Sequence, residues 1–397
     1  MPDTLIFLAH SMAPEKVDEY MRKGRMPNLK ELVEKGASGE TRSVFSTISP
    51  ADYTSALTGV TPSTHGIHGF QNLPEGFDMP RTGQGGVVED RRGETETRPY
   101  TSYDVGSEWV WELIDSRSIQ MGVFSPSTYP APDIEGNIWV SGYWNHPAPY
   151  LKDLPAACND QDFRQKLLER FPNHRVTYPI AVPPAYPENV ESEKGYLENM
   201  LEFAREESEK IHAQRVDVMK NEEGKYFVTE EGLLDYVQHL LWPRSDANPY
   251  SDQVDSWLRE RDLLGDYYSH IDDMIGRYLE ELGDDVNVIV FSPHGQEEGD
   301  EGFSFHDRFR KLYSAGIWEI PEGWEFRDEK PDWEPLMRAE NSRRGFYAFS
   351  GSDFERKDSG PSISCMDLTP VILELEGEDI PLHLDGELPE EVFIHEG

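Results

Sequence analysis

The hydrophobic positions along the chain predict helices that alternate with short, mainly apolar strands. Thr4–Ala9 is an apolar run of strand length, and Pro27–Gly36 carries a helical apolar stripe that ends at a glycine. The longest periodic stretch is Leu264–Leu282, where apolar residues recur with the spacing of a helix face. Val286–Phe291 follows it as a second apolar run. Wholly apolar runs of this kind are typical of strands that are covered on both faces.

Weaker patterns fill the region between these segments. Trp109–Ile114 carries a helical stripe, and Met121–Phe124 and Ile138–Val140 have the composition of strands. This alternation predicts an α/β fold with a central, largely parallel sheet and helices on both faces. Ligands of such folds bind beyond the carboxyl ends of the strands, so the residues after Ala9 and Phe291 are the first candidates for a site.

The chain is predicted to form a single α/β domain over residues 1–397. Residues 151–215 are rich in proline and then helical in pattern, which predicts an insertion or cap over the sheet. Gly83–Thr97 has weak periodicity and many Gly, Arg and Glu residues, so we expect an exposed excursion there. No internal repeat is present.

Charge changes the picture of possible partners. Of the 397 residues, 76 are Asp or Glu and 37 are Lys or Arg, which gives a formal net charge of −39. Because nucleic-acid binding depends on Lys and Arg releasing counterions from phosphates, this balance excludes an electrostatic nucleic-acid binder. Hydrophobic residues make up 37% of the chain and aromatic residues 11%, which is enough for a folded core. The acidity therefore predicts a protein of a salt-rich cytoplasm.

The cysteines and the N-terminus give the expected location. Cys158 and Cys365 are the only cysteines, which argues against a disulfide scaffold or a zinc ribbon. The first apolar run is short and follows Asp3 rather than a basic segment, so it predicts neither a signal peptide nor a membrane span. We expect a cytoplasmic protein with no membrane partner.

Three segments place chemically useful side chains near the expected site. Ser49 precedes Pro50 near a helix start, where its hydroxyl could act as a nucleophile or simply as an N-cap. Asp235 and His239 are four residues apart, so on a helix they would share a face as a pair of metal ligands, or as a capping Asp and a solvated His. His294 follows the apolar run that ends at Phe291.

The order of the motifs adds a family resemblance. The relevant stretches are Met26–Gly36, Thr58–Ile67 (TGVTPSTHGI), Phe124–Pro130 (FSPSTYP), Gly136–Gly142 (GNIWVSG), Asp367–Leu373 (DLTPVIL) and Asp385-Gly386. Together they resemble the type I phosphodiesterase and nucleotide pyrophosphatase family of the alkaline phosphatase superfamily. A sulfatase or phosphomutase of that superfamily fits the Thr58–Ile67 and Phe124–Pro130 stretches less well.

The resemblance implies an alkaline-phosphatase-like fold and a two-metal hydrolase in which a Ser or Thr oxygen attacks phosphorus. Three positions depart from the family pattern. The first strand should end in Asp-Gly, but this chain has His10-Ser11. Pro293 stands where the family has the Asp of an Asp-His-Gly element, and a late His falls on Asn341 or Ser342. The site has thus lost anionic ligands for a dication.

These observations lead to one main hypothesis and one alternative. The main hypothesis is a metal-dependent phosphodiesterase-type hydrolase with an altered metal site, acting on a small phosphorylated substrate. It uses a divalent ion, zinc or manganese, and one ion rather than two. The alternative is a catalytically degenerate paralogue that acts as a binding or regulatory module. The predicted site consists of Ser49 as nucleophile and Asp235, His239, His294 and His10 as metal ligands, with His306 and the acids of 297–301 as possible replacements.

Overall fold

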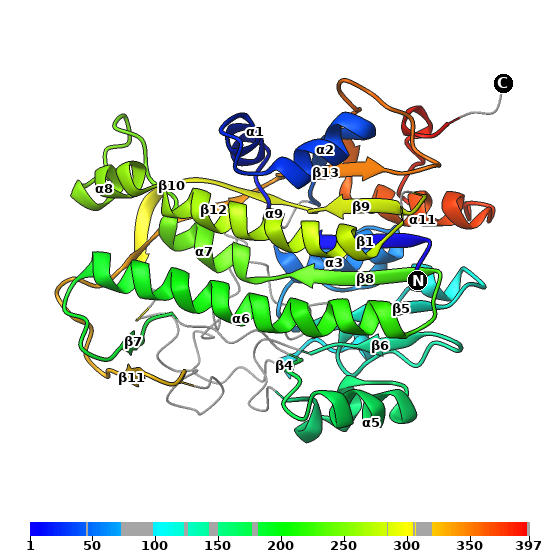
Figure 1. The fold of residues 1–397 in the computed structure, drawn as a ribbon, viewed down its shortest axis with the longest axis horizontal. Helices are drawn as coiled ribbons and strands as arrows, with labels where there is room; N and C mark the ends of the chain where they lie inside the picture. Colours follow the sequence, from blue (N-terminus) through cyan, green and yellow to red (C-terminus); the bar gives the residue numbers. More distant parts are fainter. Residues whose placement is uncertain are drawn as a thin grey trace.

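An eight-stranded sheet forms the centre of this computed structural model, which describes residues 1–44, 47–72, 98–122, 126–142, 150–176, 182–283, 285–304, 306 and 320–394. The strand order is β14-β2-β13-β9-β1-β8-β5-β6 (Figure 1). The strands are β1 (Thr4–Ala9), β2 (Ala37–Arg42), β5 (Ser118–Met121), β6 (Ile138–Val140), β8 (Tyr226–Glu231), β9 (Asn287–Phe291), β13 (Arg344–Ser350) and β14 (Ile363–Ser364).

Most of the sheet is parallel, as the sequence predicts. β1 pairs in parallel with both β8 and β9, and β5 continues the parallel arrangement between β8 and β6. β13 runs antiparallel to β9 and β2. The carboxyl ends of β1, β8 and β9 therefore lie side by side at one edge of the sheet, which is where a ligand site is expected.

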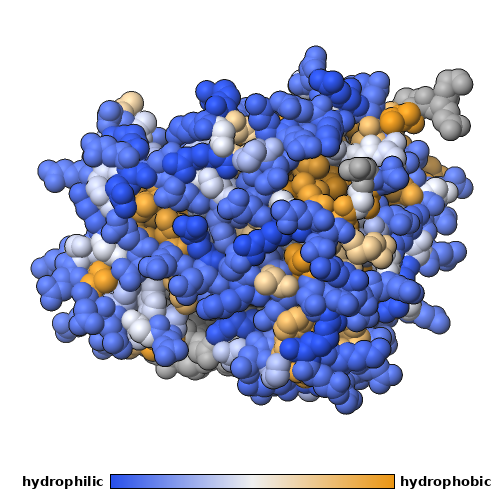
Figure 2. All heavy atoms as spheres, in the orientation of Figure 1, coloured by the Kyte–Doolittle hydropathy of each residue, from blue (hydrophilic) through white to orange (hydrophobic). Residues whose placement is uncertain are grey.

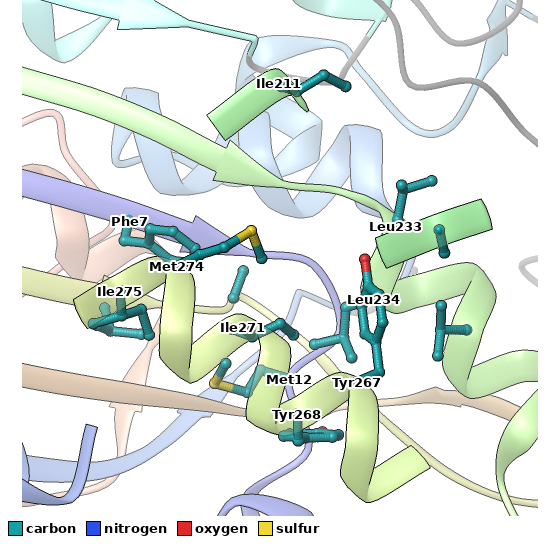
Figure 3. Close-up of a cluster of buried hydrophobic side chains, with 14 of the residues drawn as sticks. Phe7, Met12, Ile211, Leu233, Leu234, Tyr267, Tyr268, Ile271, Met274 and Ile275 are labelled. Carbon is teal, nitrogen blue, oxygen red and sulfur yellow. The ribbon is translucent and has the colours of Figure 1, made fainter. Parts of the chain in front are cut away.

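Helices cover both faces of the sheet. One core cluster joins Leu5, Phe7 and Ala9 of β1 to helices that include α6, α7 and α9, and Figure 3 shows part of it. A second cluster joins Ile6 and Leu8 to α3 and α11, because successive strand residues point to opposite faces. The helices are α1 (Pro14–Arg22), α2 (Pro27–Lys35), α3 (Ser49–Thr58), α4 (Pro62–His65), α5 (Gln161–Arg170), α6 (Glu193–Asn221), α7 (Leu233–Leu241), α8 (Gln253–Arg261), α9 (Leu263–Glu281) and α11 (Leu368–Glu376).

Small two-stranded sheets complete the described structure. β10 (Gly295–Ser304) pairs with β12 (Leu336–Ser342) directly after the end of β9. The other pairs are β7 (Ala185–Pro187) with β11 (Trp324–Phe326), and β3 (Gln71–Asn72) with β4 (Arg98–Pro99). The β10–β12 pair lies next to the main sheet, where β10 contacts β13.

One predicted helix differs from the structure. Trp109–Ile114 contains only one short 3-10 turn, Val110–Glu112, in which Glu112 accepts a hydrogen bond from the backbone N–H of Trp109. Of the strand predicted at Met121–Phe124, residues 123 and 124 lie outside the described residues, while Met121 is the last residue of β5 and Gly122 has a φ of +75°. Gly83–Thr97 lies outside the described residues.

Residues 151–215 contain α5 and most of α6. α6 packs against α9 and β8, so this part of the segment lies on the helical layer of the sheet (Figure 1). An insertion or cap at 151–215 stays a prediction.

The surface and the membrane prediction can be compared with the structure directly. The face seen in Figure 2 is largely hydrophilic, with scattered hydrophobic patches. Among the described residues, no helix combines the length and the apolar character that a membrane span requires.

Candidate active site

The candidate site lies at the C-terminal ends of the three central parallel strands. His10 and Ser11 follow β1, and His294 follows β9. Asp235 comes from α7, which begins directly after β8. Ser49 is the first residue of α3, with Pro50 in the first turn as the sequence indicates. Four segments that are far apart in the chain thus meet at one place.

A continuous chain of hydrogen bonds joins four of these side chains. Ser49 Oγ lies 3.2 Å from His294 Nε2, and His294 Nδ1 lies 3.3 Å from Ser11 Oγ. The Ser11 hydroxyl donates a short hydrogen bond to Asp235 Oδ1. We call the set Ser49, His294, Ser11 and Asp235 the serine relay.

The surrounding acceptors fix the direction of donation in the serine relay. His294 Nδ1 also lies 3.3 Å from the carbonyl oxygen of Gly295, which can only accept. Nδ1 therefore carries the proton, and Nε2 is the acceptor that faces Ser49. Since an ionised carboxylate only accepts, Ser11 gives its single proton to Asp235 and offers a lone pair to His294. Every donor in the relay thus points from Ser49 toward Asp235.

Burial sets the charge states of the relay. His294 is fully buried, and burial lowers its pKa to about 4, although Asp235 opposes this shift. Burial alone would raise the pKa of Asp235, but the imidazoles of His239, His294 and His10 and the Ser11 hydrogen bond hold it below its usual range. The resting site at neutral pH therefore contains a neutral imidazole and an ionised carboxylate.

His10 does not join the relay. Its Nε2 lies 2.6 Å from Glu230 Oε1 of β8, and both side chains are buried. Its ring stacks on Tyr53 of α3, with the ring centroids 4.4 Å apart. His10 is thus held by an acid and an aromatic ring, and its centroid is 6.4 Å from that of His294.

Asp235 and His239 share one face of α7, as their spacing predicts. Asp235 Oδ2 lies 3.7 Å from His239 Nε2, and His239 Nδ1 donates to the carbonyl oxygen of Ala339 at 2.7 Å. On the other side, Gln296 Nε2 donates to Asp235 Oδ1 at 2.9 Å. Asp235 Oδ1 therefore receives hydrogen bonds from two neutral groups, the Ser11 hydroxyl and the Gln296 amide.

The loop after β1 holds Ser11 in an unusual conformation. Its φ is +58°, in the left-handed region that favours glycine, which is the residue that the resembled family has here. Gln238 Nε2 donates to the Ser11 carbonyl at 2.6 Å, and Tyr268 in turn donates to Gln238. The fold thus keeps a side chain at a backbone position that costs a non-glycine residue about 1–2 kcal/mol.

The described residues do not fit a two-metal centre. Among them, no group of three or more His, Cys, Asp or Glu side chains is arranged to hold a metal ion. Asp235 Oδ1 is occupied by neutral donors, and His294 directs a protonated nitrogen at Ser11 and Gly295. Only Asp235 and His239 retain the arrangement of a ligand pair. A dication needs more anionic ligand oxygens than this set supplies.

The replacements that the sequence offered lie elsewhere. His306 Nε2 donates to the carbonyl oxygen of Arg327, away from the relay. Asn341, one of the two positions for the late His, donates through Nδ2 to the carbonyl of Thr47 at 3.1 Å. Glu298 accepts from Ser245 and Asn248. Neither His306 nor Glu298 joins Asp235 and His239.

The fold is α/β and similar to that of alkaline phosphatase. The chain belongs to the type I phosphodiesterase/nucleotide pyrophosphatase family, whose model matches residues 4–354. Members of this family typically depend on divalent metal ions.

Two solved structures of one murine protein show the same fold. Murine ectonucleotide pyrophosphatase/phosphodiesterase 5 is 13% identical, with 97% of each chain covered and a TM-score of 0.50. An inactive variant of the same murine protein in complex with AMP is 12% identical, with 99% of this chain and 100% of that chain covered and a TM-score of 0.51. A mutant of alkaline phosphatase PafA is 14% identical over 99% of each chain, with a TM-score of 0.49. No curated protein matches this chain.

Proposed function

We propose that this chain is a phosphoric ester hydrolase of the phosphodiesterase type, with Ser49 Oγ as the nucleophile. The observation that carries the proposal is the hydrogen bond from Ser49 to His294 Nε2, at the carboxyl edge of the sheet. A serine is a weak nucleophile until a base or a metal ion removes its proton. Ser49 has such a base within hydrogen-bond distance.

The position of Ser49 supports the attack on an anionic ester. Ser49 begins the ten-residue helix α3, so the positive end of the helix dipole lies at the nucleophile. Family membership supports a hydrolase of this kind. The substrate is proposed to be a small phosphodiester, and a nucleotide ester is a sensible candidate because the related murine protein was solved with AMP.

The proposed reaction does not include a zinc or manganese ion. Asp235 and His239 supply one carboxylate and one imidazole, which is a small donor set for a dication, and His10 faces Glu230. The assay below includes both metals, so that a metal requirement would be detected.

Hydrolysis of bis(4-nitrophenyl) phosphate and of the 4-nitrophenyl ester of thymidine 5′-monophosphate tests the proposal. Each is measured with EDTA, with zinc and with manganese. We expect turnover by the parent protein and a loss of about 10³-fold or more in Ser49→Ala, because the nucleophile is removed. Ser352→Gly, an exposed change beyond the opposite end of the sheet, serves as the control.

The alternative function gives a different result. If the parent hydrolyses neither ester under any of the three conditions, or if Ser49→Ala matches the parent, the chain is a non-catalytic paralogue. Binding of AMP, measured by calorimetry on the parent protein and on Ser49→Ala, would then show whether the site acts as a binding module.

A further inference from the structure

We propose that the serine relay activates Ser49 without a metal ion, so that His294 acts as the general base and Ser11 and Asp235 position it. This inference rests on the proposed function and deepens it.

The first argument is the geometry of the four groups. Ser49, His294, Ser11 and Asp235 form an unbroken series of hydrogen bonds whose donors all point the same way. A base held by a third group and oriented toward a hydroxyl is the arrangement by which serine nucleophiles are activated in metal-free hydrolases. Here His294 and Asp235 are not in direct contact, and the Ser11 hydroxyl links the imidazole to the carboxylate.

The second argument is that the relay occupies one of the two carboxylate oxygens of Asp235 that a metal ion could use. The carboxylate oxygen Asp235 Oδ1 accepts from Ser11 and from Gln296, and the Gln296 side chain is fully buried. Binding a cation at this oxygen would break both hydrogen bonds and leave a buried hydroxyl and a buried amide unsatisfied. Each such loss costs about 1–3 kcal/mol.

The third argument concerns the conformation of Ser11. A non-glycine residue at φ +58° is disfavoured, and such residues cluster at functional sites because the surrounding structure holds them there. The side chain that carries this cost is the one that bridges His294 and Asp235. A glycine would relieve the backbone but could not make the bridge, which gives Ser11 a role that its backbone alone does not explain.

The proposed reaction has two chemical steps, the transfer of the phosphoryl group to Ser49 and its transfer to water. Ser49 Oγ attacks phosphorus while its proton moves to His294 Nε2, and the proton then passes to the departing alcohol as the bond from phosphorus to that oxygen breaks. A water molecule next attacks the phosphoseryl group and gives its proton to His294. The bond between Ser49 Oγ and phosphorus breaks, and His294 returns a proton to Ser49. The sum is hydrolysis of one phosphoric ester bond.

A fluorophosphonate probe tests the relay independently of turnover. This reagent loses fluoride when an activated serine attacks its phosphorus, and intact mass spectrometry detects the adduct. In EDTA, we expect Ser49 to be labelled in the parent and not in Ser49→Ala. Ser11→Gly should label about 10–100-fold more slowly, within the range attributed to general acid–base catalysis. In this variant the relief of the strained backbone offsets part of the cost of losing the hydrogen bonds of the hydroxyl.

A matched variant separates the side chain of Ser11 from its backbone. Ser11→Ala keeps the Cβ atom and loses only the hydroxyl, so it should label as slowly as Ser11→Gly but melt lower than Ser11→Gly. Both variants should lower kcat for bis(4-nitrophenyl) phosphate more than they change KM, because the relay acts in the chemical step. Ser352→Gly should label and turn over like the parent.

The possible failures are distinguishable. If zinc or manganese is required for labelling and for hydrolysis, and EDTA abolishes both, the relay is overturned while the proposed function stands. If Ser11→Gly labels at the parental rate, the bridge is not used. If neither labelling nor hydrolysis occurs under any condition, the proposed function fails as well.

Discussion

Asp52, on the same helix as Ser49, is a fully buried acid that has no contact with the relay. Its Oδ1 accepts from Ser43 Oγ at 2.7 Å and from the backbone N–H of Val44 at 3.1 Å. Burial raises its pKa to about 8, and these two hydrogen bonds only partly oppose the shift. The folded protein therefore holds a proton on Asp52 at pH values where the unfolded chain, with an Asp pKa near 3.9, does not.

This proton makes a testable contribution to stability. Between about pH 4 and pH 8 the unfolded state binds fewer protons at this residue, so Asp52 lowers the free energy of unfolding as the pH rises, by up to about 1.4 kcal/mol per unit. Asp52→Asn should remove this dependence. We expect urea unfolding to show a stability difference in favour of the variant that grows from pH 5 to pH 8. A difference that is constant with pH would contradict the assignment.

At the level of single residues, the sequence could supply the candidates but not their pairing. Ser49, His294 and Asp235 do converge, because each follows or begins an element at one edge of the sheet. Ser11 and Glu230 were not predicted as functional, since their roles depend on which strands are neighbours. One feature of the sequence could have indicated a role for Ser11: it is a serine at a position where the resembled family has glycine. His10, whose role as a ligand stays a prediction, faces Glu230.

The element that positions His294 is the turn from β9 into β10. A Cβ atom on Gly295 would lie 2.2 Å from the carbonyl oxygen of Arg344, at the start of β13. This is backbone that is held in the sheet and has little room to move. The His294-Gly295 sequence thus allows two strands to approach closely just where the relay begins.

Replacing Gly295 tests this close approach. Gly295→Ala should lower the free energy of unfolding by about 1–3 kcal/mol, because the added methyl group forces β10 and β13 apart. The same shift should move His294 and slow the reaction of Ser49 with a fluorophosphonate. Gly283→Ala is the matched control, since no heavy atom lies within 4 Å of its Cβ position. Equal stability of the two variants in urea would show that the turn can adapt.

Other elements of the family motifs have structural roles that the sequence alone left open. His65 Nδ1 accepts from the backbone N–H of Ile67, so its Nε2 donates to Ser55 Oγ at 2.9 Å. Burial lowers the pKa of His65 to about 3, which keeps it neutral. Asp385 accepts from the backbone N–H of Thr61 at 2.8 Å. These contacts hold the turn after α3 against the C-terminal part of the chain.

At the scale of the whole molecule, hydrophobic periodicity predicted the sheet and its main helices but not its order. The long stripe at Leu264–Leu282 is α9, Leu263–Glu281, because a helix on one sheet face must present a continuous apolar side. The helix predicted at Trp109–Ile114 was wrong. There, tertiary packing rather than local pattern determines the backbone, so a short apolar run cannot be assigned from sequence alone.

The net charge of −39 is a property of the entire surface, and it leads to the last prediction. At neutral pH the acids repel one another in the folded state, and the Debye length falls from about 10 Å at 0.1 M salt to about 3 Å at 1 M. Raising potassium chloride from 0.1 to 2 M at pH 7.5 should therefore raise the urea midpoint. At pH 5, close to the sequence pI of about 4.6, the same salt should raise it much less, because little net charge remains to be screened. An equal gain at both pH values would assign the effect to strengthened apolar burial instead of to charge.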